Sequence, residues 1–412
     1  MENLEEYNED ELVAPEWLNE EFFEKILNET EREKNVKVKS IDVKPGSKKG
    51  DHYASVMFRI NVNCVDFEKT VIVKVMPFVD GPKKDSLDVS LFETEISMYT
   101  EIIPDFEKTL REAGDNTVIG GKCVYAALKP HPIIIFEDLT QKNYKSVSNW
   151  GGDWEITKKA IQKLGRWHAL SYKSFKDGNN DLQKFSSNFF SGDKMIEFPP
   201  FGSAYTNFLE MLKGTKEFYP YVEKFEKIAQ NEPLVKVQNI YKAFFNGEKA
   251  NLFVLTHSDF HIKNFMILEN EAGEVQDVKL IDFQLCIFAP AIIDLIYLIY
   301  MTLDSESRIH RRNEIIHYYY EVFLKTLEKL KFEGDVPKLT DIYKDMITFK
   351  DFEIFMLITS LPMVLSFQEG NSKVGDEAFN DSDKMKEFYR NPIYIEYLKK
   401  VLPSFLQQGF LD

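Results

Sequence analysis

The sequence predicts an α+β protein of two lobes, a small lobe with an antiparallel sheet and one helix and a large, mainly helical lobe. Three observations carry this prediction. The segment 36–77 shows the period-two alternation of half-buried strands, one helix and two more strand candidates follow it, and the helical period dominates from residue 153 onward. The 412 residues suffice for two lobes, and no internal repeat or low-complexity linker divides them. The predicted parts are an N-terminal helical extension at 1–35, a small lobe at 36–139 and a large lobe at 140–412.

Apolar residues at helical spacing after Pro15 predict an N-terminal helix over 15–27 that docks on a larger body. Alternating burial over 52–62 and an apolar run over 71–77 predict two antiparallel strands. A helix over 88–103 is expected to bury Val89, Phe92, Ile96, Tyr99 and Ile103. Two strands and then a series of helices are predicted at 121–129, 132–137, 153–171, 200–245, 291–330, 340–368 and 383–405.

Charge and composition exclude several classes of function. The net charge of −16 argues against nucleic acid as a partner and against adsorption to anionic membranes. The acidic N-terminus lacks the basic and apolar regions of a signal peptide, and three widely spaced cysteines fit a reducing, cytoplasmic compartment. The apolar run 285–303 is about a bilayer thick, but it contains Pro290 and Asp294, so we predict a buried helix.

The stretch from Leu255 to Gln284 carries the strongest functional pattern. His257, Asp259 and Asn264 stand in the spacing H-x-D-x-x-x-x-N, and Asp282 follows at the end of an apolar, strand-like run. Kinases of the protein-kinase superfamily space a catalytic base and two magnesium ligands in this way. The structural alternative is a β-hairpin of 254–255 with 265–268 around a polar turn.

Phosphoryl transfer from ATP explains this spacing, because it requires positioning and charge neutralisation more than covalent chemistry. Asp259 is the expected catalytic base, which would accept the proton of the acceptor hydroxyl. Asn264 and Asp282 would hold Mg²⁺, which prefers oxygen ligands. His257 is expected to brace the loop. ATP and Mg²⁺ are therefore the expected cofactors.

Other residues fit the same chemistry. Lys74, in an otherwise apolar strand, either guards a sheet edge or binds the α- and β-phosphates. Its partner would come from the following helix, where Glu93 and Glu95 flank the apolar stripe about equally. The segment from Gly46 through Gly50 to Ser55 either covers the phosphates or forms an ordinary β-turn.

Two acidic positions and an aromatic-rich segment complete the candidates. Residues Glu137 to Leu139 lie at the end of a predicted buried strand. They form either the hinge between the lobes, whose backbone would hydrogen-bond adenine, or an ordinary strand end with solvated acids. Asp294 opens an apolar helix and is expected to accept backbone N–H groups of the catalytic loop, as structural support. Most aromatic residues of 185–225 belong in a core, and some are expected to touch an apolar acceptor. These are Phe189, Phe190, Phe198, Phe201, Tyr205 and Phe208.

With these residues in view, the chain resembles the ecdysteroid kinase-like family of insects, which is related to choline kinases and aminoglycoside phosphotransferases and has a protein-kinase-like fold. The resemblance spans nearly the whole chain. The family's F-x-x-E-x-x-x-Y pattern falls on Phe92 to Tyr99 and implies Glu95 as the partner of Lys74, and its A-P-x-x-x-D-L element implies the bracing role of Asp294. Further matches lie at 15–18, 50–55, 136–139, 164–170, 257–264 and 282–284.

The resemblance implies ATP- and Mg²⁺-dependent phosphorylation of a small-molecule hydroxyl, with ecdysteroid hormones or detoxified foreign compounds as acceptors. This chain departs from the family at two positions. Ser258 replaces a usual glycine, and His261 replaces a usual tryptophan where related enzymes face the acceptor, so His261 is expected to influence substrate choice.

Three readings of the function compete. The favoured one is a kinase for an ecdysteroid or another apolar alcohol. The alternatives are a choline or ethanolamine kinase-like enzyme, which needs an acidic, aromatic cage for its cation, and a catalytically silent scaffold that binds a ligand. Asp294 follows Asp282 by only 12 positions, which leaves little room for the activation loop of a protein kinase. A small-molecule acceptor is therefore expected, without a protein partner.

Overall fold

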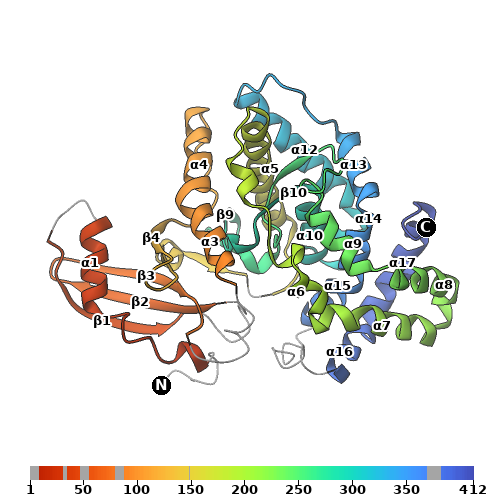
Figure 1. Ribbon diagram of the computed structural model, residues 1–412, viewed down its shortest axis with the longest axis horizontal. Helices are drawn as coiled ribbons and strands as arrows, with labels where there is room; N and C mark the ends of the chain where they lie inside the picture. The colour runs from red at the N-terminus through yellow and green to blue at the C-terminus, as the bar shows by residue number, and fades with distance from the viewer. Residues whose placement is uncertain (1–8, 31–34, 47–54, 79–87, 148, 369–381) are drawn as a thin grey trace. The chain divides into compact units, whose positions relative to one another are not determined.

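The computed structural model describes residues 9–30, 35–46, 55–78, 88–147, 149–368 and 382–412 (Figure 1). The chain divides into two compact units, each built from separated segments. Unit 1 comprises Met1–Glu107, Val118–Lys145 and Met266–Gln284, and unit 2 comprises Lys108–Thr117, Ser146–Phe265 and Leu285–Asp412. The predicted α+β class is confirmed: unit 1 carries an antiparallel sheet and unit 2 is mainly helical. The predicted borders near residues 35 and 139 stay predictions.

Unit 1 is organised around a five-stranded antiparallel sheet with the order β1-β2-β3-β5-β4. The side chains of β2 alternate between buried and half-buried positions, with Val56, Phe58, Ile60 and Val62 in the core. This is the alternation that the sequence shows, because successive residues of a strand point to opposite faces. The strands are β1 (Val38–Pro45), β2 (Val56–Cys64), β3 (Glu68–Val75), β4 (Cys123–Ala127) and β5 (Ile133–Glu137).

Helix α1 (Glu20–Thr30) lies across this sheet (Figure 1) and buries Phe23, Ile26 and Leu27 in the same core. The predicted helix exists, but it begins five residues after Pro15. The side-chain oxygen of Asn19 accepts the backbone N–H of Phe22 at 3.1 Å, which satisfies a donor of the first turn. A capping side chain, not the proline, therefore sets the start.

The predicted helix over 88–103 is longer than expected. Helix α3 (Val89–Ser97) continues through a π-helical turn (Met98–Ile102) into α4 (Ile103–Glu112). Val89 is 43% exposed, and Glu95 is 1% exposed. The buried face of α3 therefore includes an acid that the apolar stripe did not contain.

Two small sheets flank the predicted catalytic loop in the sequence. Strand β7 (Phe253–Thr256) pairs with β10 (Ile287–Pro290), whereas β8 (Phe265–Glu269) lies between β6 (Tyr144–Ser146) and β9 (Val275–Leu280). The two strands that border the loop therefore belong to different sheets. The β-hairpin alternative for this segment is wrong.

Unit 2 is built around α5 (Trp154–Lys176), which packs along α12, and around α10 (Ile292–Thr302), whose residues are all buried. The run 285–303 is therefore not one helix, since Ile287–Pro290 forms a strand before α10 begins. The other helices are α6 (Asp193–Glu197), α7 (Pro199–Gly214), α8 (Tyr219–Gln230), α9 (Pro233–Tyr241), α11 (Ser305–His310), α12 (Arg312–Lys329), α13 (Leu339–Thr348), α14 (Lys350–Ile358), α15 (Ser360–Gln368), α16 (Ser382–Tyr389) and α17 (Pro392–Gln407).

Within the described residues, no individual helix combines the length and apolar character needed to span a membrane. One bent pair, α14 with α15, meets these criteria together.

Candidate active site

The loop after β7 has an unusual backbone conformation at Ser258. Its φ is +64°, in the left-handed region that residues other than glycine rarely adopt. The Ser258 hydroxyl lies 2.8 Å from that of Thr256, which in turn donates to the carbonyl oxygen of Ile287 at 2.9 Å. The conformation explains why a glycine suits this position, and these hydrogen bonds help to hold a serine there.

Asp294 fixes the same loop from α10. Its Oδ2 accepts the backbone N–H of His257 at 2.7 Å, and its Oδ1 accepts that of Ser258 at 2.8 Å. The carboxylate is fully buried. The contact expected for Asp294 is therefore present, because a buried charge at the start of an apolar helix requires such donors.

His168 and Tyr319 extend this support, and the sequence did not reveal their part in it. His168 Nε2 lies 3.0 Å from Asp294 Oδ2, and Nδ1 lies 2.7 Å from the Tyr319 hydroxyl. Because both oxygens of Asp294 already accept backbone N–H groups, we assign Nε2 of His168 as a further donor to this carboxyl group. The segment around His168 resembles the family, but only the fold shows that the imidazole contacts Asp294.

Asp259 follows directly and is held through both carboxylate oxygens. The Asn264 amide nitrogen donates to Oδ2 at 2.9 Å and to the Asp259 carbonyl oxygen at 2.9 Å, and His261 Nε2 lies 3.2 Å from Oδ1. Burial raises the pKa of Asp259, but the nearby His261, His257 and Asn264 outweigh this effect and hold the pKa below its usual range. Asp259 is therefore ionised at neutral pH, with its carboxylate fixed.

His261 is locked in one orientation. The backbone N–H of Lys263 donates to Nδ1 at 3.2 Å, so Nε2 carries the hydrogen and points to Asp259. The imidazole ring also lies 5.4 Å from the ring of Trp150, centroid to centroid. Its predicted position at the acceptor stays a prediction, while its contact with Asp259 is a feature that the sequence did not reveal.

In unit 1, Lys74 is buried between two carboxylates. Its Nζ lies 2.5 Å from Glu95 Oε2, 3.0 Å from Asp282 Oδ1 and 3.4 Å from Gln284 Oε1. Burial lowers the pKa of Lys74, but the charges of Asp282 and Glu95 outweigh it and keep the ammonium group charged. Glu93 is exposed on the same helix, so the geometry selects Glu95 as the partner of Lys74.

The backbone around Asp282 is also constrained. Asp282 has a φ of +64°, and the following Phe283 is fully buried, with its ring 5.0 Å from that of Tyr99. The N–H of Phe283 is hydrogen-bonded to the Glu95 carboxylate. Strained non-glycine residues occur often at functional sites, and here packing on both sides holds the conformation.

The remaining predicted positions lie around the sheet. The Glu137 carboxylate accepts the backbone N–H of Lys122 at 3.0 Å and forms an ion pair with Lys142 at 2.5 Å. Both of its oxygens therefore contact residues close to the end of β5. Leu139 begins a 3-10 turn (Leu139–Lys142) and is buried. Ser55 is buried immediately before β2, whereas Gly50 lies outside the described residues.

Asn264 and Asp282 each carry an oxygen of the kind that Mg²⁺ prefers. Because the Asn264 amide nitrogen is used by Asp259, its amide oxygen is the group left for a cation. Asp282 offers a carboxylate, and no three His, Cys, Asp or Glu side chains gather as a metal site within the described ranges. Mg²⁺ is commonly held by one or two protein oxygens together with substrate phosphates. The roles of Asn264 and Asp282 as magnesium ligands stay predictions.

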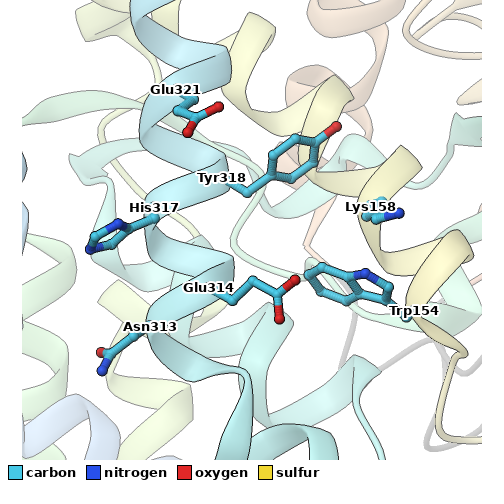
Figure 2. Close-up of a pocket in the computed structure, with 7 residues that line it drawn as sticks. All are labelled: Trp154, Lys158, Asn313, Glu314, His317, Tyr318 and Glu321. Atoms are coloured by element: carbon cyan, nitrogen blue, oxygen red, sulfur yellow. The ribbon is translucent and has the colours of Figure 1, made fainter.

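A separate hollow of about 370 Å³ lies on the surface between α5 and α12 (Figure 2). Figure 2 shows that Glu314 extends toward the Trp154 ring, while Asn313 and His317 point away from it. Glu314 pairs with Arg311 at 3.2 Å. None of the predicted site residues lines this hollow, so it is not the candidate site.

The sequence signature of the ecdysteroid kinase-like family matches residues 49–332, which is more than half of the chain. The chain belongs to this family. The resemblance noted from the sequence is thereby confirmed, and it places the chain among the small-molecule kinases. No curated protein matches the sequence.

Several solved structures resemble the chain remotely. A choline kinase from Cryptosporidium parvum Iowa II is 12% identical, covers 90% of this chain and 91% of its own, and gives a TM-score of 0.44. An ethanolamine kinase from Plasmodium vivax is 13% identical, with 87% of this chain and 83% of the other covered and a TM-score of 0.38. Aminoglycoside 2'-phosphotransferase-IIIa, in complex with GDP, is 10% identical, with 90% of this chain and 99% of the other covered and a TM-score of 0.40. Such low scores say nothing about this chain's substrate.

Proposed function

We propose that this protein is an ATP- and Mg²⁺-dependent kinase that phosphorylates a hydroxyl of an ecdysteroid or of another apolar or xenobiotic alcohol. The observation that carries the proposal is the carboxylate of Asp259, which is ionised and held through one oxygen by Asn264 and through the other by His261. A fixed, ionised carboxylate in a loop of this spacing suits a catalytic base.

The roles of the residues follow from their contacts. Asp259 accepts the proton of the acceptor hydroxyl as the oxygen forms its bond to the γ-phosphorus and the bond to the leaving ADP oxygen breaks. Lys74, anchored by Glu95, would bind phosphate oxygens, and Asn264 and Asp282 would hold the cation. When bound, ATP would supply the phosphoryl group, and Mg²⁺ would neutralise the negative charge of the phosphates. Asp294 and His168 keep the loop in position. A cytoplasmic location remains part of this proposal.

The test is product formation from a defined panel of acceptors. The purified protein is incubated with ATP, Mg²⁺ and one of three acceptors, an ecdysteroid, a plant phenolic glycoside or choline, and products are read by mass. We expect the first two classes to gain one phosphate, with no effect of choline as a competitor. Phosphorylation of choline alone would instead support the choline kinase-like alternative. Tight ligand binding without any ATP consumption would support the silent scaffold.

A further inference from the structure

A line of aromatic rings runs through unit 2 from the helix that braces the catalytic loop. Tyr297 follows Asp294 by three residues on α10, and residues at this spacing share one face of a helix. The Tyr297 ring lies 6.2 Å from that of Phe190, and Phe190 stacks on Tyr241 at 5.0 Å with an interplanar angle of 10°. Helix α10 also packs against the 3-10 turn Ile262–Asn264 of the catalytic loop. The inner end of this line therefore lies beside the loop.

The two phenol groups at this inner end are unusual for buried polar atoms. Tyr241 is fully buried and Tyr297 is 4% exposed. The hydroxyl of Tyr241 faces that of Tyr297, but it makes no hydrogen bond of normal geometry to any residue that the structure describes. Burial is the main cause of the raised pKa of both phenols, and the charge of Asp259 also contributes. Buried hydroxyls generally have partners, so this pair has capacity for another oxygen.

The outer end of the line is partly exposed. Phe189, Phe198 and Phe201 are each half-buried. Their rings contact one another at centroid distances of 5.1 to 6.4 Å, and Phe201 lies 6.3 Å from Phe190. We call these six residues the aromatic wall: Phe189, Phe190, Phe198, Phe201, Tyr241 and Tyr297.

We propose that the aromatic wall is the acceptor subsite and that Tyr241 and Tyr297 determine specificity for apolar molecules with at least two oxygens. One hydroxyl would reach Asp259, a second oxygen would hydrogen-bond to the phenols, and the apolar skeleton would cover the phenylalanine rings. This inference rests on the proposed function for its reaction, but the binding it describes does not require turnover.

The phenol pair distinguishes this ligand class from a quaternary ammonium compound. Aromatic rings attract such cations, but a trimethylammonium group can neither donate nor accept a hydrogen bond. The buried Tyr241 hydroxyl would stay without a normal hydrogen bond beside it, which weakens binding. A polyhydroxylated apolar molecule satisfies both the rings and the hydroxyls, so the wall favours it.

Equilibrium binding without ATP tests the proposal on the full-length protein. The probes are a polyhydroxylated steroid, a monohydroxy steroid, a polyhydroxylated flavonoid and choline. Tyr297→Phe and Tyr241→Phe remove only a hydroxyl each, and we expect each to bind the polyhydroxylated probes about tenfold more weakly, with the monohydroxy steroid unaffected. Phe198→Ala should weaken every apolar probe. The control is Tyr394→Phe, which removes a buried hydroxyl that donates to Leu357 at 2.9 Å.

The outcomes separate this inference from the proposed function. If both Tyr→Phe variants bind the polyhydroxylated probes like the wild type, or if no apolar probe binds the wild type, the subsite is wrong. Product formation with unchanged KM in both variants would refute the subsite while the kinase assignment stands. Binding that depends on both tyrosines, with no product from ATP and Mg²⁺, would instead refute the proposed function alone.

Discussion

The carboxylate of Asp294 accepts the backbone N–H of Ser258 at 2.8 Å, and Ser258 has a φ of +64°. A buried acid on α10 thus stabilises a left-handed serine directly before Asp259. The two residues are 36 positions apart in the sequence. The loop that carries the proposed base is therefore held by a helix that follows it in the chain.

Replacing Asp294 by Asn should damage both stability and turnover. An amide offers one acceptor oxygen and turns an N–H toward a backbone donor, so a buried donor loses its partner. We expect a loss of about 3 kcal/mol in the free energy of unfolding, measured by chemical denaturation, and at least a tenfold fall in turnover.

Asp345→Asn is the matched control for this change. Asp345 is also buried and accepts the backbone N–H groups of Asn251 and Leu252 at 3.0 Å, without a contact to the catalytic loop among its described bonds. It should lose comparable stability and keep its turnover where folded. An equal loss of turnover in both variants would show that Asp294 acts only through general stability.

Substitutions at Ser258 should rank by backbone conformation. Ser258→Gly removes the conformational free energy that a non-glycine residue requires at positive φ, but it also removes the contact with Thr256. Because these effects oppose each other, the free energy of unfolding should change by less than about 1 kcal/mol. Ser258→Ala keeps the cost and loses the contact, so it should be about 1 kcal/mol less stable than the wild type. Thermal unfolding of the three proteins measures this order. Alanine more stable than glycine would contradict the strained conformation.

Glu95 and Glu93 offer a paired test of the Lys74 site. Glu95→Gln removes the charge that anchors Lys74 at 2.5 Å, and we expect Mg²⁺-ATP to bind about 10- to 100-fold more weakly. Glu93→Gln, on the exposed face of the same helix, should bind like the wild type. Calorimetric titration measures both affinities. Equal affinities would remove Glu95 from the nucleotide site.

Acid should weaken unit 2 through Asp115. Burial raises the pKa of Asp115, but hydrogen bonds from Thr117 and Arg166 hold it well below its usual range. A lowered folded-state pKa stabilises the fold above the unfolded value, about 3.9, and this contribution is lost as the pH falls through the folded value.

The free energy of unfolding, followed from pH 6 to pH 3, should therefore fall less steeply in Asp115→Asn than in the wild type. Asp181→Asn, at an exposed position, should keep the wild-type slope. Parallel curves for all three proteins would show that the Asp115 contacts do not contribute.

The sequence predicts those parts of the fold in which apolar and polar residues alternate with a regular period. Strand β2 is half-buried, so its alternation appears in the residue types. Residues 286–303 are buried, so the strand Ile287–Pro290 and the helix α10 both appear in the sequence as one continuous apolar run. Its interpretation as one helix was wrong for that reason. The start of α1 depends on the side chain of Asn19, a local detail that apolar spacing does not reveal.

In the candidate site, too, some contacts could be predicted from the sequence and others are visible only in the fold. A single acid in an apolar helix requires buried donors, so the partners of Asp294 could be predicted from the sequence. His168 is 126 residues from Asp294, and nothing in its local pattern indicates that contact. Apolar periodicity does not choose between Glu93 and Glu95; the family pattern implies Glu95, and the folded chain shows its contact with Lys74.

The most direct test of the account is phosphate transfer by Asp259→Asn, measured at saturating Mg²⁺-ATP and acceptor beside the wild type, with nucleotide affinity determined in parallel. Loss of the proposed base should lower turnover by at least 100-fold, while nucleotide affinity changes less than about threefold. Wild-type turnover by the variant would contradict the assignment of Asp259 as the catalytic base.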